Sequence, residues 1–247
     1  KFGVAKQILV EEFLDGEEMS YFIVTDGKNY KFFGSAQDHK RVGEGDKGKN
    51  TGGMGCYSAS RLPNKDLELK IKTKIIEPTL NAINEQGGVY KGFLYVGLMI
   101  KNNDPFLIEF NVRMGDPECQ TILPTLDTDL FDVLTSCCDG TLNQTNIDFS
   151  MSKSICVVLC SKGYPEKYEN NIEIKDLEKL KLLKNQNIFH AGTLKTKNGL
   201  VSNGGRVLNF VSTSDDFSKS RDEVINLIKR LNWKYGYFRR DIGHKVI

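Results

Sequence analysis

Short runs of hydrophobic residues in the first third of the chain follow the pattern of β-strands. The runs are QILVEEF (residues 7–13), SYFIVT (20–25) and YKFF (30–33). They are rich in β-branched and aromatic residues, which fit a pleated, half-buried surface. The sequence DGKN between the last two runs is a tight-turn signal. The pattern therefore predicts three strands, with the second and third joined as a hairpin.

The next stretch, residues 36–55, has almost no hydrophobic residues. It reads AQDHKRVGEGDKGKNTGGMG, with a glycine every few positions and charges of both signs. A run of about 20 residues without periodicity inside a compact domain is usually either disordered or functional. The mixed charges and clustered glycines favour the second interpretation, so we expect an irregular functional loop here.

Hydrophobic residues at helical spacing predict three helices. The first covers residues 66–86, ends at Gly87-Gly88 and contains Pro78, which should kink or split it. The second covers residues 129–138 and ends at Asp139-Gly140, and the third covers roughly residues 215–232.

Two further strands are predicted at residues 92–100 and 105–112, joined by the turn-like residues 102–104. The polar stretch 143–152 then indicates a boundary between two units, residues 1–148 and residues 149–247. The second unit opens with an apolar strand at residues 155–160 and continues with several short strands. The boundary thus separates a mixed unit from a β-rich one.

Charge and cysteine content exclude several classes of function. The chain has 34 Lys and Arg against 32 Asp and Glu in 247 residues, so no overall field attracts nucleic acid or an anionic membrane. Its longest uncharged apolar run, residues 92–100, is far shorter than the roughly 20 residues of a membrane helix. The six cysteines contain no C-x-x-C pair, which argues against a disulfide framework or a zinc site. We therefore expect no nucleic-acid or membrane partner and a reducing, cytoplasmic location.

The segment FLIEFNVR (residues 106–113) carries the most chemistry. Strand alternation places Phe106, Ile108 and Phe110 on one apolar face, and Leu107, Glu109, Asn111 and Arg113 on the other. Carboxylate and amide oxygens suit Mg²⁺, and a guanidinium can fork onto a phosphoryl group. The alternative is an edge strand with a solvated face and a surface ion pair. These residues alone do not decide between the two.

At this point the sequence resembles a known family. Glu109, Asn111 and Arg113 in this spacing resemble the metal and phosphate strand of ATP-grasp ligases, and RMGDPECQ (residues 113–120) resembles the RFGDPE-type signature of the phosphoribosylamine–glycine ligase family. Met114 stands where that family has Phe or Leu. Other segments resemble the family in its order: EEFLDGEEMS (11–20), DHKRVGEGDKGKNTGGMGCYS (38–58), GFLYVGLMI (92–100), SKGYP (161–165), FHAGT (189–193), GGRVLN (204–209) and RRDIG (239–243).

The resemblance implies an α+β fold, namely the larger lobe of an ATP-grasp fold followed by a small β-rich C-terminal domain. The lobe would be a mostly antiparallel sheet with helices. The implied reaction belongs to de novo purine biosynthesis. ATP phosphorylates the carboxylate of glycine, and the amine of phosphoribosylamine attacks the acyl phosphate to give glycinamide ribonucleotide, ADP and phosphate. The implied cofactors are ATP and Mg²⁺ or Mn²⁺, with Glu109 and Asn111 as metal ligands and Arg113 as a donor to the transferring phosphoryl group.

The same resemblance assigns the remaining site residues. Residues Glu11, Phe13 and Leu14 would meet the adenine, and Glu18 would accept from the ribose hydroxyls; without the resemblance this segment reads as a strand ending in an acidic turn. The glycine-rich loop would hold the acceptor substrates through its backbone N–H groups, the form of an anion-binding nest. Asp38 and Gly53 would lie at the catalytic centre, with the charge of Asp38 facing an amine. The residues implied for acceptor binding are His39, Lys40, Asn50, Thr51, Gly52, Gly53, Met54, Gly55 and Asp116.

Enzymes of the family carry an additional domain and a smaller ATP-grasp lobe before the point that matches Lys1. We therefore expect this chain to be part of a longer enzyme, with that N-terminal portion as its partner. Two other hypotheses stay open: a different ATP-grasp carboxylate–amine ligase on the same scaffold, and a non-catalytic interaction module derived from the family.

Overall fold

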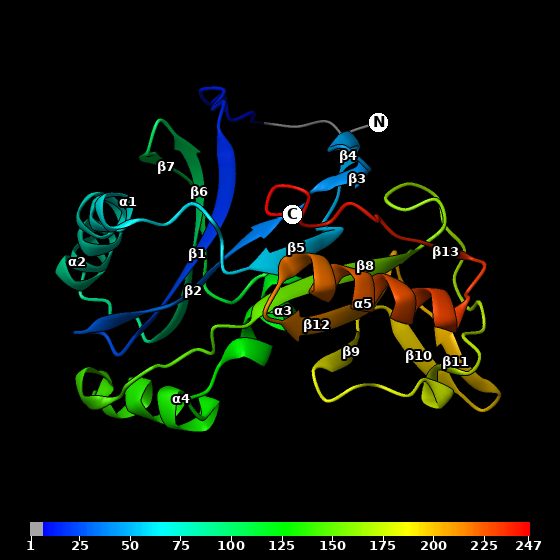
Figure 1. Cartoon of the computed structure of the whole chain (residues 1–247). Helices are drawn as coiled ribbons and strands as arrows, with labels where there is room; N and C mark the ends of the chain where they lie inside the picture. The colour runs from blue at the N-terminus through cyan, green and yellow to red at the C-terminus, as the bar shows by residue number, and fades with distance from the viewer. Residues whose placement is uncertain (1–6) are drawn as a thin grey trace.

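The computed structural model describes residues 7–247, which form one large antiparallel sheet with helices on both of its faces (Figure 1). The strands follow one another across the sheet in the order β7-β6-β1-β2-β5-β8-β12-β9, and β13 pairs with β8. Their bounds are β1 Glu17–Thr25, β2 Tyr30–Asp38, β5 Gly55–Ser58, β6 Gly92–Lys101, β7 Asp104–Asn111, β8 Lys153–Ser161, β9 Gln186–His190, β12 Arg206–Ser214 and β13 Gly236–Tyr237. Two small hairpins lie outside this sheet, β3 Arg41–Gly43 with β4 Lys47–Asn50, and β10 Thr193–Thr196 with β11 Gly199–Ser202.

Strand β1 shows how the sheet divides its two faces. Met19, Tyr21 and Ile23 point into a core shared with α1 (Lys65–Ile71) and α2 (Glu77–Glu85). Phe22 and Val24 point to the opposite core, beside α3 (Glu118–Ile122) and α4 (Leu130–Asp139). This alternation is the expected two-residue period of a strand, and it determines which side chains can share a site.

The helix predicted at residues 66–86 is divided, as expected. A π-helical segment, Lys72–Ile76, separates α1 from α2. Pro78 lies in the first turn of α2, directly after that segment, so its missing N–H falls where the helical hydrogen-bond pattern changes. The second predicted helix is also present as α4, with the carboxylate of Asp129 accepting from Phe131 N at its start.

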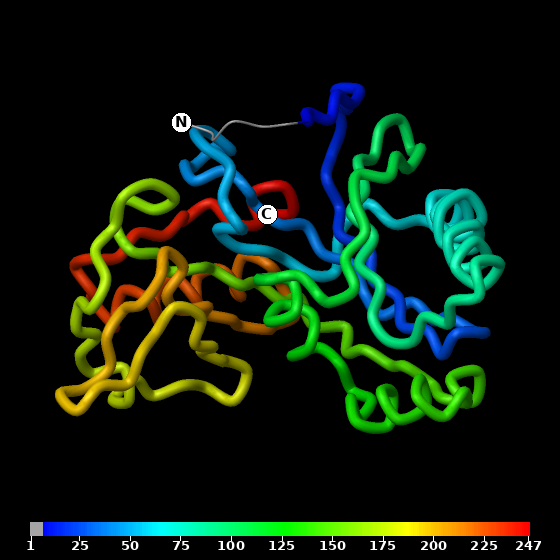
Figure 2. Tube along the Cα trace, turned by 180° about the vertical axis from the view of Figure 1, so that it is seen from behind, coloured from blue at the N-terminus to red at the C-terminus, as the bar shows by residue number. Residues whose placement is uncertain are grey.

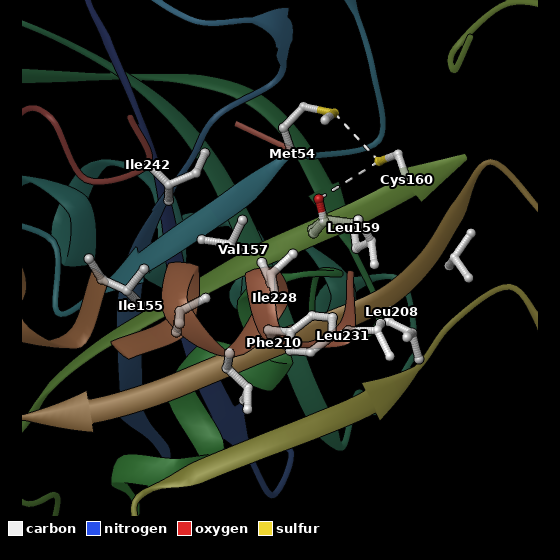
Figure 3. Close-up of a cluster of buried hydrophobic side chains, with 14 of the residues drawn as sticks. Met54, Ile155, Val157, Leu159, Cys160, Leu208, Phe210, Ile228, Leu231 and Ile242 are labelled. Carbon is white, nitrogen blue, oxygen red and sulfur yellow. Dashed lines mark hydrogen bonds between the residues drawn. The ribbon is translucent and has the colours of Figure 1, made fainter. Parts of the chain in front are cut away.

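A third core fills the C-terminal half between the sheet and α5 (Phe217–Leu231), the third predicted helix. Figure 3 shows side chains of β8, β12 and α5 packed together there, with Met54 reaching in from the segment before β5. Cys56 of β5 lies opposite Cys156 of β8. Strands from before and after the polar stretch at residues 143–152 therefore belong to one hydrogen-bonded sheet. The division into residues 1–148 and 149–247 stays a prediction.

Two sequence-based expectations are wrong. Residues 7–13 form no strand, because no strand of the described residues lies alongside to complete a ladder, and Phe13 is 88% exposed. Residues 36–55 are not an irregular loop: β2 continues to Asp38, and the hairpin β3–β4 follows. Gly45 and Asp46 take positive φ values of 67° and 54°, which allow the tight turn between two otherwise polar strands.

Single 3₁₀ turns at Leu123–Thr125, Leu142–Gln144 and Leu177–Lys179 complete the regular structure. Among the helices of residues 7–247, none combines the length and apolar character needed to cross a bilayer.

Candidate active site

The candidate site lies on the face of the sheet opposite α1 and α2. The Glu109 side chain has room on this face because the residue of β6 beside it, Gly97, has no side chain. Gly97 pairs with Ser20 on one side and with Glu109 on the other. A Cβ at Gly97 would lie 3.0 Å from Cε1 of Tyr95 and 3.2 Å from Cγ of Glu109. The bare backbone of Gly97 is therefore the floor over which Glu109 and Tyr95 extend.

Glu109 and Asn111 lie side by side on β7. The Asn111 amide donates to Oε1 of Glu109 across 3.1 Å, which leaves the amide oxygen as its remaining ligand atom. Both oxygens are hard ligands of the kind Mg²⁺ prefers, and this ion keeps several waters and shares phosphate oxygens. The residues present therefore fit a partly solvated Mg²⁺ or Mn²⁺. Across residues 7–247 no cluster of three or more His, Cys, Asp or Glu side chains suits a metal held by protein alone.

The apolar face predicted for β7 is wrong because of a β-bulge. The register with β6 shifts between Gly97 and Leu98, which shifts the alternation of side chains within β7. Leu107 consequently lies beside Ile75 and Pro78, and Phe110 packs in the same helix-side core, while Phe106 and Ile108 stay 39% and 40% exposed. Arg113 lies beyond the end of β7, is exposed and donates to its neighbour Met114 O at 3.0 Å.

A shallow groove of about 410 Å³ connects residues 11–14 to β6 and β7. Its lining includes Glu11, Phe13 and Leu14 on one side and Met99 and Phe106 on the other. The structure thus brings the three residues expected at the adenine to β7, with mixed apolar and acidic walls. A larger hollow of about 660 Å³ between residues 171–176 and 230–235 contains none of the predicted site residues.

Buried acids and one lysine form the centre of the site. Lys40 Nζ lies 3.2 Å from Glu18 Oε1 and 3.7 Å from Asp38 Oδ2. The Asp38 side chain is 3% exposed, and its Oδ1 has no hydrogen-bond partner within the described residues. This combination places a lysine ammonium directly between an accessible and a buried carboxyl group.

A second buried acid, Glu118 of α3, adjoins the cluster. Ser20 Oγ donates to Glu118 Oε1 at 2.9 Å and lies 3.2 Å from Tyr95 Oη. Burial raises the pKa of Tyr95 to about 12, so its phenol stays protonated. Ser20 thereby links β1 to β6 and α3 across the site.

The pKa values of Asp38 and Lys40 are both raised, for different reasons. Burial, followed by the charge of Glu118, raises the pKa of Asp38 well above its usual range, although Lys40 acts in the opposite direction. Burial disfavours the charged form of Lys40, but Asp38 and Glu18 more than compensate and raise its pKa. The ammonium form of Lys40 is therefore favoured, and Asp38 holds a proton more tightly than an ordinary aspartate does.

The glycine-rich loop is not an open anion nest. Four of its N–H groups already have partners: Thr51 N donates to Lys40 O (2.8 Å), Gly52 N to Tyr164 Oη (2.9 Å), Gly53 N to Thr51 Oγ1 (3.0 Å) and Met54 N to His39 O (2.9 Å). The Met54 side chain is fully buried in the C-terminal core beside Cys160 (Figure 3), and Gly55 pairs with Val157. Asn50 is exposed at the end of β4. Gly53 lies close to Asp38, whereas the carbonyl of Gly52 accepts from Arg206.

His39 is not a cation for a substrate anion. Its Nε2 accepts from Gly243 N at 3.3 Å, and its Nδ1 lies 3.2 Å from Gly55 O. The ring is buried, and burial followed by the positive charge of Arg239 lowers its pKa to about 4. His39 is therefore a neutral structural side chain that joins the loop to the C-terminal segment.

Four polar residues at the site were absent from the sequence-based assignment. Arg206 Nη1 donates to Gly52 O at 2.7 Å and to Asp116 O at 2.6 Å, and Asn209 Nδ2 donates to Asp116 Oδ1 at 3.4 Å. Asp116 is thus held by β12. The other two are Tyr164 and Glu118. All four lie inside the segments that carried the family resemblance, which was the available signal.

Comparisons with known proteins agree with this arrangement. The family model described as phosphoribosylglycinamide synthetase, ATP-grasp (A) domain, matches residues 1–119, and the model for the C domain of the same synthetase matches residues 154–245. The chain is 40% identical over 247 residues to a phosphoribosylamine–glycine ligase of Brucella melitensis and 44% identical over 251 residues to a chloroplastic one of Arabidopsis thaliana. It covers 58% and 47% of these proteins, about half of their length. A ligase of the same name from Vigna unguiculata is 42% identical over 241 residues, and 78% of it is covered.

Solved structures extend the comparison. The crystal structure of phosphoribosylamine–glycine ligase from Thermotoga maritima superposes with a TM-score of 0.83 at 33% identity, covering 94% of this chain and 57% of that one. A biotin carboxylase domain of a thermophilic 2-oxoglutarate carboxylase gives a TM-score of 0.63 at 12% identity, which shows a shared fold alone.

Proposed function

The chain belongs to the phosphoribosylglycinamide synthetase family, and we propose on that basis that it forms part of a ligase joining glycine to 5-phosphoribosylamine at the expense of ATP. In this reaction the carboxylate of glycine becomes a glycyl phosphate, and the amine displaces phosphate to give glycinamide ribonucleotide. The observation that carries the proposal is that Glu109 and Asn111 share one sheet face with the Lys40–Asp38 cluster. A phosphoryl donor and an acceptor could therefore meet on this face.

The nucleotide end of the proposed site is the groove between residues 11–14 and β7. Apolar side chains such as Phe13 and Phe106 suit a purine ring, while Glu109 and Asn111 would hold Mg²⁺ or Mn²⁺ at the phosphates. A bound cation supplies neutralisation of phosphate oxygens during transfer. Arg113, exposed beside them, is in reach of solvent and is the proposed donor to the transferring phosphoryl group.

The acceptor end is the cluster around Lys40. An ammonium whose pKa is raised keeps its charge at neutral pH and can hold the carboxylate of glycine. The attacking amine must lose a proton as the carbon–nitrogen bond forms. Asp38, whose raised pKa makes its carboxylate a stronger base than an ordinary aspartate, is the proposed acceptor of that proton.

The remaining walls of the nucleotide site are proposed to come from the portion of the relatives that this chain does not span. The proposal is tested by joining the chain to that N-terminal portion of the Brucella melitensis relative. ATP-dependent phosphate release is then measured with glycine, alanine or bicarbonate as the acid and phosphoribosylamine as the amine. Release that requires both glycine and phosphoribosylamine is the expected result. Release with bicarbonate, or with no amine, would assign the site to another carboxylate ligation.

A further inference from the structure

The hairpin β3–β4 lies in the sequence between two groups of candidate site residues, Asp38–Lys40 and Thr51–Gly53. Lys40 comes directly before its first strand, and Thr51 directly follows its second. Both the N–H and the hydroxyl of Thr51 donate to Lys40 O, at 2.8 and 2.9 Å, which closes the neck of the hairpin. A rotation of the hairpin would therefore move Lys40 and the Gly52–Gly53 turn together.

The C-terminal segment, residues 237–243, lies along this hairpin although nearly 200 residues separate them in the sequence. Figure 2 shows the red C-terminal segment beside the blue hairpin, and Figure 1 shows the same two segments from the other side. Tyr237 Oη donates to Val42 O at 3.0 Å, and the Arg240 N–H donates to Glu44 Oε1 at 3.1 Å. The contact thus begins at the base of the hairpin and reaches its turn.

Arg239 is the centre of this contact, and its side chain is 0% exposed. Its guanidinium forks onto Asp241, with Nε and Nη2 at 2.8 and 2.7 Å from the two carboxylate oxygens. Its Nη1 donates to Asp46 Oδ1 at 2.8 Å and to Arg41 O at 2.9 Å. One buried cation therefore fixes the first residue and the turn of the hairpin at the same time.

The two aspartates complete the arrangement. Asp241 Oδ2 accepts from Gly45 N at 2.8 Å, so the turn is held by its backbone as well as by Asp46. The Arg239 charge opposes the effect of burial and lowers the pKa of Asp46 and that of Asp241, the latter to about 2. Both carboxylates are ionised at neutral pH, and they hold the single guanidinium from two sides.

We propose that Arg239, through Asp46 and Asp241, is a positioning residue that holds the β3–β4 hairpin and thereby sets the place of Lys40 and Gly52–Gly53 for the acceptor substrates. This inference rests on the proposed ligase function for its kinetic part. Arg239 touches neither Lys40 nor the groove of the nucleotide, so it acts through the hairpin.

The Asp46→Asn variant tests the proposal with little disturbance of the fold. Asn tolerates the positive φ of 54° at this position as well as Asp does, and Arg239 keeps its fork onto Asp241. Asp176→Asn is the matched control, because Asp176 also has a positive φ, 61°, and forms an ion pair only with the exposed Lys179. Arg239→Lys is the conservative variant for rescue, and Arg239→Met removes the charge entirely.

Amide hydrogen exchange without substrate is the first measurement. Exchange of residues 43–53 should become about 10-fold faster in Asp46→Asn, faster still in Arg239→Met and intermediate in Arg239→Lys, with no change in Asp176→Asn. Unchanged exchange at residues 51–53 in Asp46→Asn would overturn the proposal, whether or not the wild type makes glycinamide ribonucleotide.

Steady-state kinetics of the completed enzyme is the second measurement. The KM for glycine and phosphoribosylamine should rise about 10-fold in Asp46→Asn while the KM for ATP stays within about 2-fold, because the hairpin does not reach the nucleotide groove. Equal changes in all three KM values would contradict the positioning role. Failure of the wild type to use glycine would contradict the proposed function. The hydrogen-exchange result would then still decide whether Arg239 positions the hairpin.

Discussion

The Glu109 carboxylate extends over the bare backbone of Gly97, where any side chain would displace it. The account makes it a metal ligand, so a Glu109→Gln change in the completed enzyme should lower turnover about 100-fold, as loss of one preorganised electrostatic contact typically does. The required Mg²⁺ concentration should rise as well. The measurement is phosphate release against Mg²⁺ concentration. Glu85→Gln, on the exposed end of α2, is the matched control. Wild-type turnover of Glu109→Gln at every Mg²⁺ concentration would remove Glu109 from the site.

His39 gives a pH dependence with a definite sign. Its pKa is lowered from 6.5 to about 4 in the folded chain, so the unfolded chain binds more protons between these values. Stability therefore falls as the pH is lowered through this window, by about 1.5 kcal/mol between pH 6.5 and pH 5. Urea unfolding at the two pH values should show this loss in the wild type and a smaller one in His39→Gln.

Other titrating groups do not confuse this comparison. Asp46 and Asp241, whose pKa values are lowered, stabilise the fold above the ordinary aspartate range and lose that effect only as the pH falls below it. Asp38, whose pKa is raised, acts in the opposite direction to His39 but is present in both proteins. His190→Gln, at an exposed position, is the control. Equal pH dependence in the wild type and in His39→Gln would show that His39 is protonated without cost.

At the scale of elements, the turn at Gly53 joins the loop to the buried acid. Gly53 has a φ of 117°, and a Cβ there would lie 2.6 Å from Cδ of Pro117 and 2.8 Å from Oδ1 of Asp38. Gly87 offers a contrast, since its φ of 79° is also positive but nothing lies within 4 Å of a Cβ. We expect Gly87→Ala to cost about 1 kcal/mol of unfolding free energy and Gly53→Ala about 3 kcal/mol. Urea unfolding measures both, and equal costs would mean that the loop yields without disturbing Asp38.

The elements that were predictable from the sequence are those whose pattern is local. Helix α4 has its own cap at Asp129 and its own stop at Gly140, and β1 and β2 have runs of β-branched and aromatic residues with a tight turn between them. The hairpin β3–β4 was missed because its strands are mostly polar. Contacts with residues 237–241, rather than a buried apolar face, hold this hairpin. The bulge in β7 was missed because it arises from the register with β6.

In the candidate site, too, residues related by local spacing were predictable, and residues placed by contacts between distant segments were not. Glu109 and Asn111 were predicted together because residues two apart share a face of a regular strand, and the structure brings them together since the bulge in β7 lies before Glu109. The anion nest at Thr51–Met54 was wrong because its N–H partners, Tyr164 above all, come from distant segments. Arg206 and Glu118 reach the site through sheet order and helix packing, which no local spacing encodes.

At the scale of the whole molecule, one sheet carries both the acid–lysine cluster and the proposed metal ligands of β7, while β8 and β12 support residues 52–55 from the C-terminal half. The groove proposed for the nucleotide is open, since Phe13 and its neighbours are exposed along residues 8–13. A shallow, open groove binds a purine weakly, because most of the ring stays in water. The C-terminal half reaches the candidate site through Tyr164, Arg206 and Asn209, which bond to Gly52 and Asp116.

The most direct test of the account compares the 247-residue chain alone with the chain joined to the N-terminal portion of the Brucella melitensis relative. Both proteins are incubated with ATP, Mg²⁺, glycine and phosphoribosylamine, and glycinamide ribonucleotide is quantified by mass spectrometry. The account predicts that the isolated chain folds but makes no measurable product, and that the joined protein makes product only when both acceptor substrates are present. Robust product formation by the isolated chain, or none by a folded joined protein, would contradict the account of where the site lies and what it does.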